Sequence, residues 1–146
     1  IDEEGTIVAV HYRLVSIFPL RYQNLVSVSH DNGINWSLPV SQGTIESPGN
    51  HMGDIAYIGD ATWMIVWRWS AYTLSTDGGV SWSSNTPLPL GNKDTLALPS
   101  VTGDQNRLVI AWHQKINETT SADMDIYYSF GTNGIATAAQ DWQLFE

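Results

Sequence analysis

An eight-residue pattern that occurs twice, with its copies 46 residues apart, restricts the fold of this chain more than any other feature. The first copy, residues 29–36, reads Ser-His-Asp-Asn-Gly-Ile-Asn-Trp, and the second, residues 75–82, reads Ser-Thr-Asp-Gly-Gly-Val-Ser-Trp. Repetition at such a period is typical of proteins built from copies of one supersecondary unit. We therefore expect a repeat architecture.

Each copy has the composition of a tight turn that follows a β-strand. An apolar, alternating stretch leads into Asp-Asn-Gly or Asp-Gly-Gly, which favours a hairpin turn. The glycines tolerate positive φ, and the aspartates can accept hydrogen bonds from the N–H groups of the turn. A calcium loop would need further carboxylates and a terminal Glu, which neither copy has. We therefore assign a structural role to Ser29, Asp31, Gly33, Trp36, Ser75, Asp77, Gly79 and Trp82, and expect both tryptophans to lie on an outer, returning strand between adjacent sheets.

Both copies resemble the Asp-box, also called the bacterial neuraminidase (BNR) repeat, with the consensus Ser-x-Asp-x-Gly-x-Thr-Trp. Only the Thr position differs, with Asn35 and Ser81 in its place. The segment Ser129-Phe130-Gly131-Thr132-Asn133-Gly134, followed by Trp142, resembles a third copy that has lost its Asp. The resemblance implies a sialidase-like β-propeller and favours an extracellular or cell-surface location.

Extended segments recur in a constant order along the chain, and no segment has the periodicity of a helix. A first long strand is expected at residues 6–12, 62–69 and 107–114, and a second at 24–31, 71–77 and 125–131. A shorter strand is expected before the second and third repeats, at 53–59 and 100–104. We predict an all-β fold, a β-propeller of four-stranded antiparallel blades, with one domain over residues 1–146 and blades at roughly 1–40, 41–90 and 91–146.

Three blades would not close a ring, because propellers usually have about four to eight. Open blade edges also invite pairing with other strands. Two completions are open at this point. Two copies of the chain could form a six-bladed homodimer, or the chain could belong to a longer propeller. The first blade lacks an innermost strand, which suits closure between chains.

Composition excludes several partners. The formal net charge is −9, whereas nucleic-acid binding and attachment to anionic membranes require a basic surface. No apolar run is long enough to insert through a membrane. No His/Glu spacing is that of a zinc site, so we expect neither metal nor cofactor.

The loops of a propeller blade alternate between two faces of the ring. The Asp-boxes lie on one face, and the resemblance implies that a ligand site lies on the other. Long loops on a rigid scaffold are where recognition usually occurs. The candidate ligand-binding residues in or beside the loops of that other face are Arg13, Arg21, Glu46, His51, Asp54, Arg68, Trp69, Lys115 and Asp125.

Trp63, Trp67 and Trp69 alternate along one expected strand, so they share one side of it. They could form a stacking platform for a sugar ring, or they could pack between adjacent blades. Packing is the favoured interpretation because aromatic residues mainly fill such gaps. Trp69 is the best platform candidate, since it is nearest to the loop.

The resemblance implies a glycoside as substrate. Catalysis, however, also requires specific residues that the fold alone does not supply. A sialidase uses three arginines, a Tyr–Glu nucleophile pair and an acidic Asp. The first arginine of the family normally lies in an Arg-Ile-Pro motif, which this sequence lacks. The leading hypothesis is therefore a non-catalytic module that binds a glycan or a protein partner. The alternative is a glycoside hydrolase, or part of one.

Overall fold

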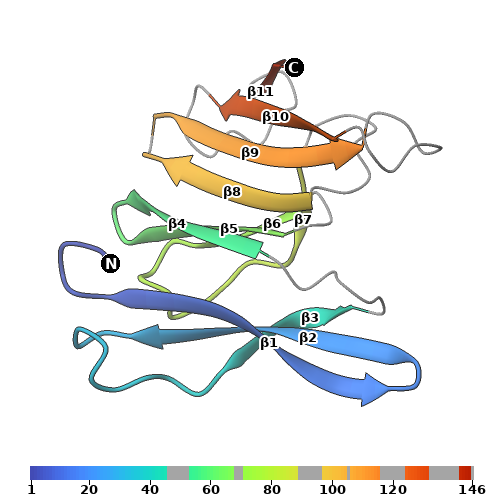
Figure 1. Cartoon of the computed structure of the whole chain (residues 1–146). Helices are drawn as coiled ribbons and strands as arrows, with labels where there is room; N and C mark the ends of the chain where they lie inside the picture. The colour runs from blue at the N-terminus through green and yellow to red at the C-terminus, as the bar shows by residue number, and fades with distance from the viewer. Residues whose placement is uncertain are drawn as a thin grey trace.

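The computed structural model describes residues 1–45, 53–67, 71–88, 97–104, 106–115, 124–131 and 142–145, and side chains within residues 1–42, 53–67, 71–88, 99–104 and 106–112. The regular secondary structure in these ranges consists of β-strands, which form three antiparallel sheets (Figure 1). The expected all-β fold is confirmed. Within the described ranges no helix has the length and apolar character needed to cross a bilayer.

The sheets follow one another along the chain. The first sheet has the order β1 (Ile7–Ile17), β2 (Leu20–Ser29), β3 (Val40–Ile45). The second has the order β4 (Gly53–Gly59), β5 (Thr62–Trp67), β6 (Ala71–Ser75), β7 (Thr86–Pro87). The third has the order β8 (Ala97–Gly103), β9 (Leu108–Lys115), β10 (Met124–Gly131), β11 (Trp142–Phe145).

The strand order matches the expected repeat, with two corrections. The first boundary, expected near residue 40, lies beyond Ile45 because β3 pairs with β2 and belongs to the first sheet. Trp36 and Trp82 do not lie on outer strands. They lie in the connections that precede β3 and β7, because the main chain uses several more residues to turn back than a tight hairpin would.

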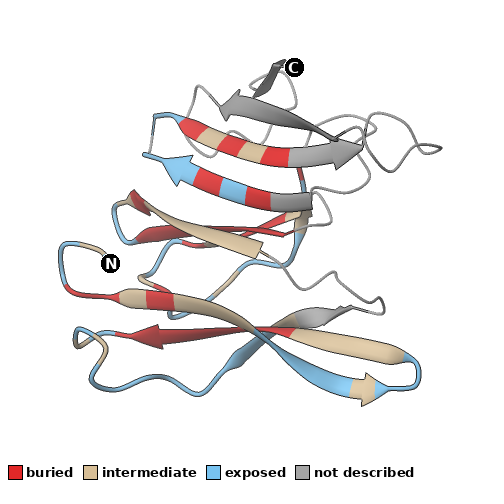
Figure 2. Ribbon diagram, viewed as in Figure 1, coloured by how far each residue is buried: buried red, intermediate tan, exposed pale blue. Residues whose placement is uncertain are grey.

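The second sheet lies between the other two, and its central strand is buried on both sides (Figures 1 and 2). Trp63, Ile65 and Trp67 of β5 pack in one apolar cluster with Val8, Val26 and Val28 of the first sheet. Met64 and Val66, on the other side of β5, pack with residues of the third sheet. A strand buried on both faces has a continuous apolar sequence, and β5 reads Thr-Trp-Met-Ile-Val-Trp.

The second cluster joins the second and third sheets. Its members are Ile58, Met64, Val66, Tyr72, Leu88, Val101, Leu108, Ile110 and Trp112. Leu108, Ile110 and Trp112 alternate along β9 and are nearly inaccessible to solvent, so they share the face of the third sheet that is turned toward the second. The stack therefore has two cores and leaves the outer faces of the first and third sheets without a neighbouring sheet among the described residues.

The three sheets do not close into a ring within the described residues. The first sheet has three strands, whereas the other two have four, and no described strand pairs with the free edge of β1. In sheets two and three the equivalent strands, β5 and β9, each have a further strand on that side. Among the described residues, the first sheet therefore has no counterpart of β4 and β8.

Candidate functional site

The first octet, residues 29–36, which we call the first Asp-box after the repeat that it resembles, is held together by its own hydrogen bonds. Asp31 Oδ1 accepts hydrogen bonds from Ser29 Oγ and from the Asn35 backbone N–H, each at 2.8 Å, and Oδ2 accepts one from Asn35 Nδ2 at 2.6 Å. Ser29 Oγ in turn accepts a hydrogen bond from the Gly33 N–H at 2.8 Å. Trp36 Nε1 donates to the Gly33 carbonyl oxygen at 3.1 Å. Both carboxylate oxygens therefore hold the turn.

The second Asp-box repeats this arrangement. Asp77 Oδ1 accepts from Ser75 Oγ and from the Ser81 N–H at 2.8 Å, and Oδ2 accepts from Ser81 Oγ at 2.5 Å. Gly79 N–H donates to Ser75 Oγ at 2.8 Å, and Trp82 Nε1 donates to the Gly79 carbonyl oxygen at 3.1 Å. Asn and Ser at the divergent consensus position both supply the donor that the second carboxylate oxygen needs. The structural assignment of the octets is thus explained atom by atom.

A serine after each box extends the repeat beyond the octet. Ser37 N–H donates to the Val28 carbonyl oxygen at 2.8 Å, and Ser37 Oγ accepts from the Val28 N–H at 2.9 Å. Ser83 makes the same two bonds with Leu74, at 2.8 and 3.0 Å. These serines close each box against its preceding strand. A serine directly follows both tryptophans in the sequence, so the repeated pattern is nine residues long.

The hydrogen bonds of the boxes stabilise ionised carboxylates. Hydrogen bonds from the Asn35 backbone and side chain lower the pKa of Asp31, and those from the Ser81 hydroxyl and backbone lower the pKa of Asp77. Both folded-state values lie below the ordinary 3.8, so this stabilisation is complete above the unfolded-state value and is lost as pH falls through the folded-state pKa.

Acid sensitivity is therefore expected to depend on the boxes. The unfolding temperature of the wild type should fall steeply as pH decreases from about 5 to about 2, the range in which such carboxylates are protonated. The Asp31→Asn/Asp77→Asn double variant should show a shallower fall, because its amides do not titrate. Thermal unfolding followed by circular dichroism across this range measures both slopes. Equal slopes in the two proteins would contradict the proposed linkage.

The Asp-boxes and the turn of the first hairpin lie on opposite sides of the sheet stack (Figure 1). The Asp-box side carries both boxes together with the β4–β5 and β8–β9 turns. The opposite side, which we call the hairpin side, carries the β1–β2 turn and the ends of β3, β5 and β9. The boxes are therefore separated from the β1–β2 turn and from the ends of β3, β5 and β9.

The structure describes the side chains of three of the nine ligand-binding residues expected from the sequence. Glu46, His51, Arg68 and Trp69 lie outside the described residues. Lys115 ends β9 and Asp125 lies near the start of β10, at the same end of the third sheet, but their side chains are also outside the described set. Arg13, Arg21 and Asp54 are described.

Arg13 and Arg21 share one face of the first hairpin. Arg13 pairs with Gln23 across β1 and β2, and its Nη2 donates to Gln23 Oε1 at 2.6 Å. Gln23 Nε2 continues the ladder to Ser41 Oγ at 2.8 Å. Arg21 lies two residues before Gln23 and so projects to the same face. This face is opposite to that of Val26 and Val28, so both arginines lie on the outer face of the sheet stack.

Asp54 joins two sheets. Its Oδ2 accepts hydrogen bonds from Ser100 Oγ at 2.9 Å and from the Val101 N–H at 2.8 Å. The carboxylate thereby connects β4 of the second sheet to β8 of the third. This gives Asp54 a structural partner that the sequence did not indicate, because the two strands are distant in sequence and meet only in the tertiary fold.

A tyrosine pair on the hairpin side was missed at the sequence level. Tyr12 and Tyr22 form an edge-to-face contact with ring centroids 5.7 Å apart and an interplanar angle of 80°. They belong to the face of the hairpin that also carries Val8 and Val26, and Tyr12 is 52% exposed. The sequence signal that could have found this pair is the presence of an aromatic residue in the strand on each side of the Phe18-Pro19 turn.

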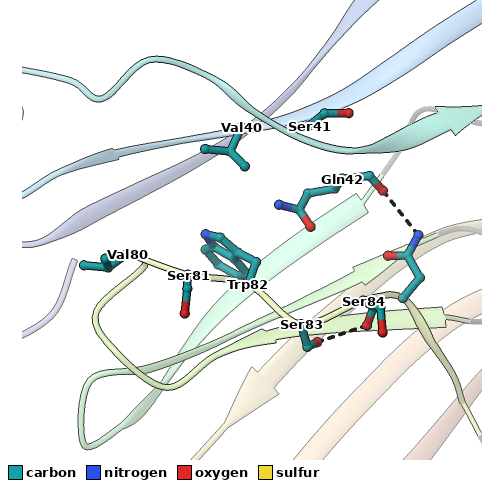
Figure 3. Close-up of a pocket in the computed structure, with 9 residues that line it drawn as sticks. Val40, Ser41, Gln42, Val80, Ser81, Trp82, Ser83 and Ser84 are labelled. Atoms are coloured by element: carbon teal, nitrogen blue, oxygen red, sulfur yellow. Dashed lines mark hydrogen bonds between the residues drawn. The ribbon is translucent and has the colours of Figure 1, made fainter.

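A groove of about 390 Å³ lies between β3 and the segment that follows the second box. Figure 3 shows Val40 and Gln42 on one side and Trp82 and Ser83 on the other. The Asn85 side-chain amide donates to the Gln42 carbonyl oxygen at 3.3 Å and links the two sides. Ser81 and Ser83 use their hydroxyls within the loop, and the Asn85–Gln42 bond joins this loop to the first sheet.

Trp63 and Trp67, the other aromatic candidates, are each 3% exposed within the cluster that joins the first and second sheets. Trp67 Nε1 donates to Thr73 Oγ1 at 2.8 Å. These two side chains are packing residues and offer no platform to a ligand. Among the described residues, no group of His, Cys, Asp or Glu has an arrangement that could hold a metal ion.

No family model and no curated protein matches the sequence. Among solved structures, the chain is similar to that of a protein of unknown function from Dyadobacter fermentans DSM 18053, with a TM-score of 0.66 over 99% of this chain and 13% identity. This chain covers 39% of the length of that protein. The likeness concerns the fold alone: a three-sheet arrangement of this kind occurs within a longer chain.

Proposed function

We propose that the chain is a non-catalytic, sialidase-like Asp-box propeller module that binds a glycan on the hairpin side, opposite the Asp-boxes. The observation that carries the proposal is the Tyr12–Tyr22 pair on that side, with Tyr12 half exposed. An aromatic ring with a polar tip offers both an apolar face to a sugar ring and a hydrogen-bonding hydroxyl. These two properties support a glycan as the ligand of this surface.

The division of roles between the two sides supports the proposal. On the Asp-box side, the carboxylates of Asp31 and Asp77 are engaged by their own turns. Their pKa values are lowered, whereas a general acid needs a raised pKa to remain protonated near neutral pH. The sequence also lacks the Arg-Ile-Pro motif of the sialidases. These features favour recognition over hydrolysis.

Binding to a glycan array, followed by titration calorimetry with the best ligand, tests the proposal. The Tyr12→Ala variant is expected to lose about tenfold in affinity, which corresponds to about 1.4 kcal/mol. Ile34→Ala is the matched control, because Ile34 is 79% exposed but lies on the Asp-box side. It should bind as the wild type does.

Two outcomes would contradict the proposal. Failure of the wild type to bind any glycan on the array would remove the glycan assignment. Turnover of a sialoside or another glycoside by the pure protein would instead favour the glycoside hydrolase alternative.

A further inference from the structure

The two Asp-boxes have the same internal hydrogen bonds but different surroundings. Gly79 of the second box is buried, and a Cβ placed on it would lie 2.9 Å from Val28 Cγ2 of the first sheet. Trp82 packs against the cluster that contains Val8, Val26 and Val28. Trp36, its equivalent in the first box, is 46% exposed. The second box has a neighbouring sheet to pack on, and the first box has none among the described residues.

The surface on which the second box packs has an equivalent in the third sheet, at the other end of the stack. Val8 pairs with Val28 immediately before the first box, and these are the residues that receive the second box. In the third sheet the equivalent pair is Ala111 and Tyr128, immediately before Ser129. Ala111 is only half-buried and alternates with Ile110 and Trp112, which face the second sheet. The Ala111–Tyr128 position therefore lies on the outer face of the third sheet.

The part of the chain that forms the outer face of the first sheet is basic. Arg13 and Arg21 lie on this face, and His11 shares it by alternation along β1. Residues 7–29 contain no Asp or Glu, whereas the whole chain has a net charge of −9. A second copy of this chain carries the receiving surface in its third sheet.

We propose that two copies of the chain associate head to tail, with the third sheet of one copy packed on the outer face of the first sheet of the other. Trp36 then lies within the contact, where it takes the place that Trp82 has between the first and second sheets. Two such contacts related by a two-fold axis give a closed dimer. This surface is separate from the tyrosine pair, so the glycan proposal and the dimer can fail independently.

The molar mass in solution, measured by size-exclusion chromatography with light scattering, tests this proposal. The wild type is expected at twice the chain mass of 16.2 kDa. Trp36→Glu is expected to be monomeric, because it would bury a carboxylate in the contact. Circular dichroism establishes that this variant is folded, which is expected since Trp36 is half exposed in the single chain.

A matched control comes from the neighbouring apolar residue of the same box. Val80, the equivalent of Ile34, stays 72% exposed although the second box is packed on a sheet. Ile34→Glu should therefore leave the dimer intact. A wild-type chain that stays monomeric at all concentrations tested, or a Trp36→Glu variant that remains dimeric, would overturn the proposal.

Discussion

Replacement of Trp112 by alanine is expected to lower the free energy of unfolding by about 3–5 kcal/mol, the range typical of aromatic truncation in a core. Trp112 is 1% exposed and packs in the cluster that joins the second and third sheets. Its removal takes apolar contacts from both sheets and leaves a cavity that β9, held on both sides by β8 and β10, can fill only in part.

Urea denaturation of the folded variant measures this loss. The control is Phe18→Ala, which removes an aromatic ring that is 92% exposed at the β1–β2 turn. Its effect should stay within about 0.5 kcal/mol, as for most surface substitutions. Similar losses in the two variants would show that the second and third sheets are not packed as described.

Replacement of Gly79 by alanine is expected to cost about 2–5 kcal/mol, because two penalties add. Gly79 has a φ of +89°, which costs a residue with a side chain about 1–2 kcal/mol. In addition, the new Cβ would lie 2.9 Å from Val28 Cγ2, and overpacking of this kind costs about 1–3 kcal/mol. The second penalty arises only because the box of one sheet touches another sheet.

Gly33→Ala separates the two penalties. Gly33 has nearly the same φ, +86°, but a Cβ there would meet only Ile7 Cδ1, at an ordinary 3.5 Å. This variant should therefore lose only the conformational part, about 1–2 kcal/mol. Denaturation of both variants at a protein concentration low enough to keep the chain monomeric gives the comparison. Equal losses would mean that the second box does not press on the first sheet.

The sequence predicted the local elements well. Alternating apolar residues placed the long strands of the second and third repeats close to their observed bounds, because strand periodicity is a local property. In the first repeat, expected at 6–12 and 24–31, the strands extend further toward their shared turn, to Ile17 and from Leu20. The Ser-x-Asp-x-Gly pattern predicted that Asp31 and Asp77 hold turns, since donor and acceptor lie within a few residues of each other. The outer strands were harder to place: β7 has only two residues, which is too short for any periodicity.

The candidate site was predicted less well, for a physical reason. Arg13 and Arg21 were selected by their closeness to a loop, but strand register places them on the outer face, opposite to the tyrosine pair. Asp54 was selected as a ligand residue, yet it binds Ser100 and Val101 of the next sheet. Which face a strand residue occupies, and which distant strand it meets, depends on register and sheet packing.

The sequence by itself determined the repeat and the internal chemistry of each Asp-box, because these depend on residues close together in the chain. Tertiary structure alone decided that the two boxes differ. Gly79 is buried and Trp82 partly buried against the first sheet, whereas Gly33 is only partly buried and Trp36 is exposed, although their hydrogen bonds are the same. Burial depends on the neighbour that the fold brings to a surface, and two identical motifs at different places in a stack have different neighbours.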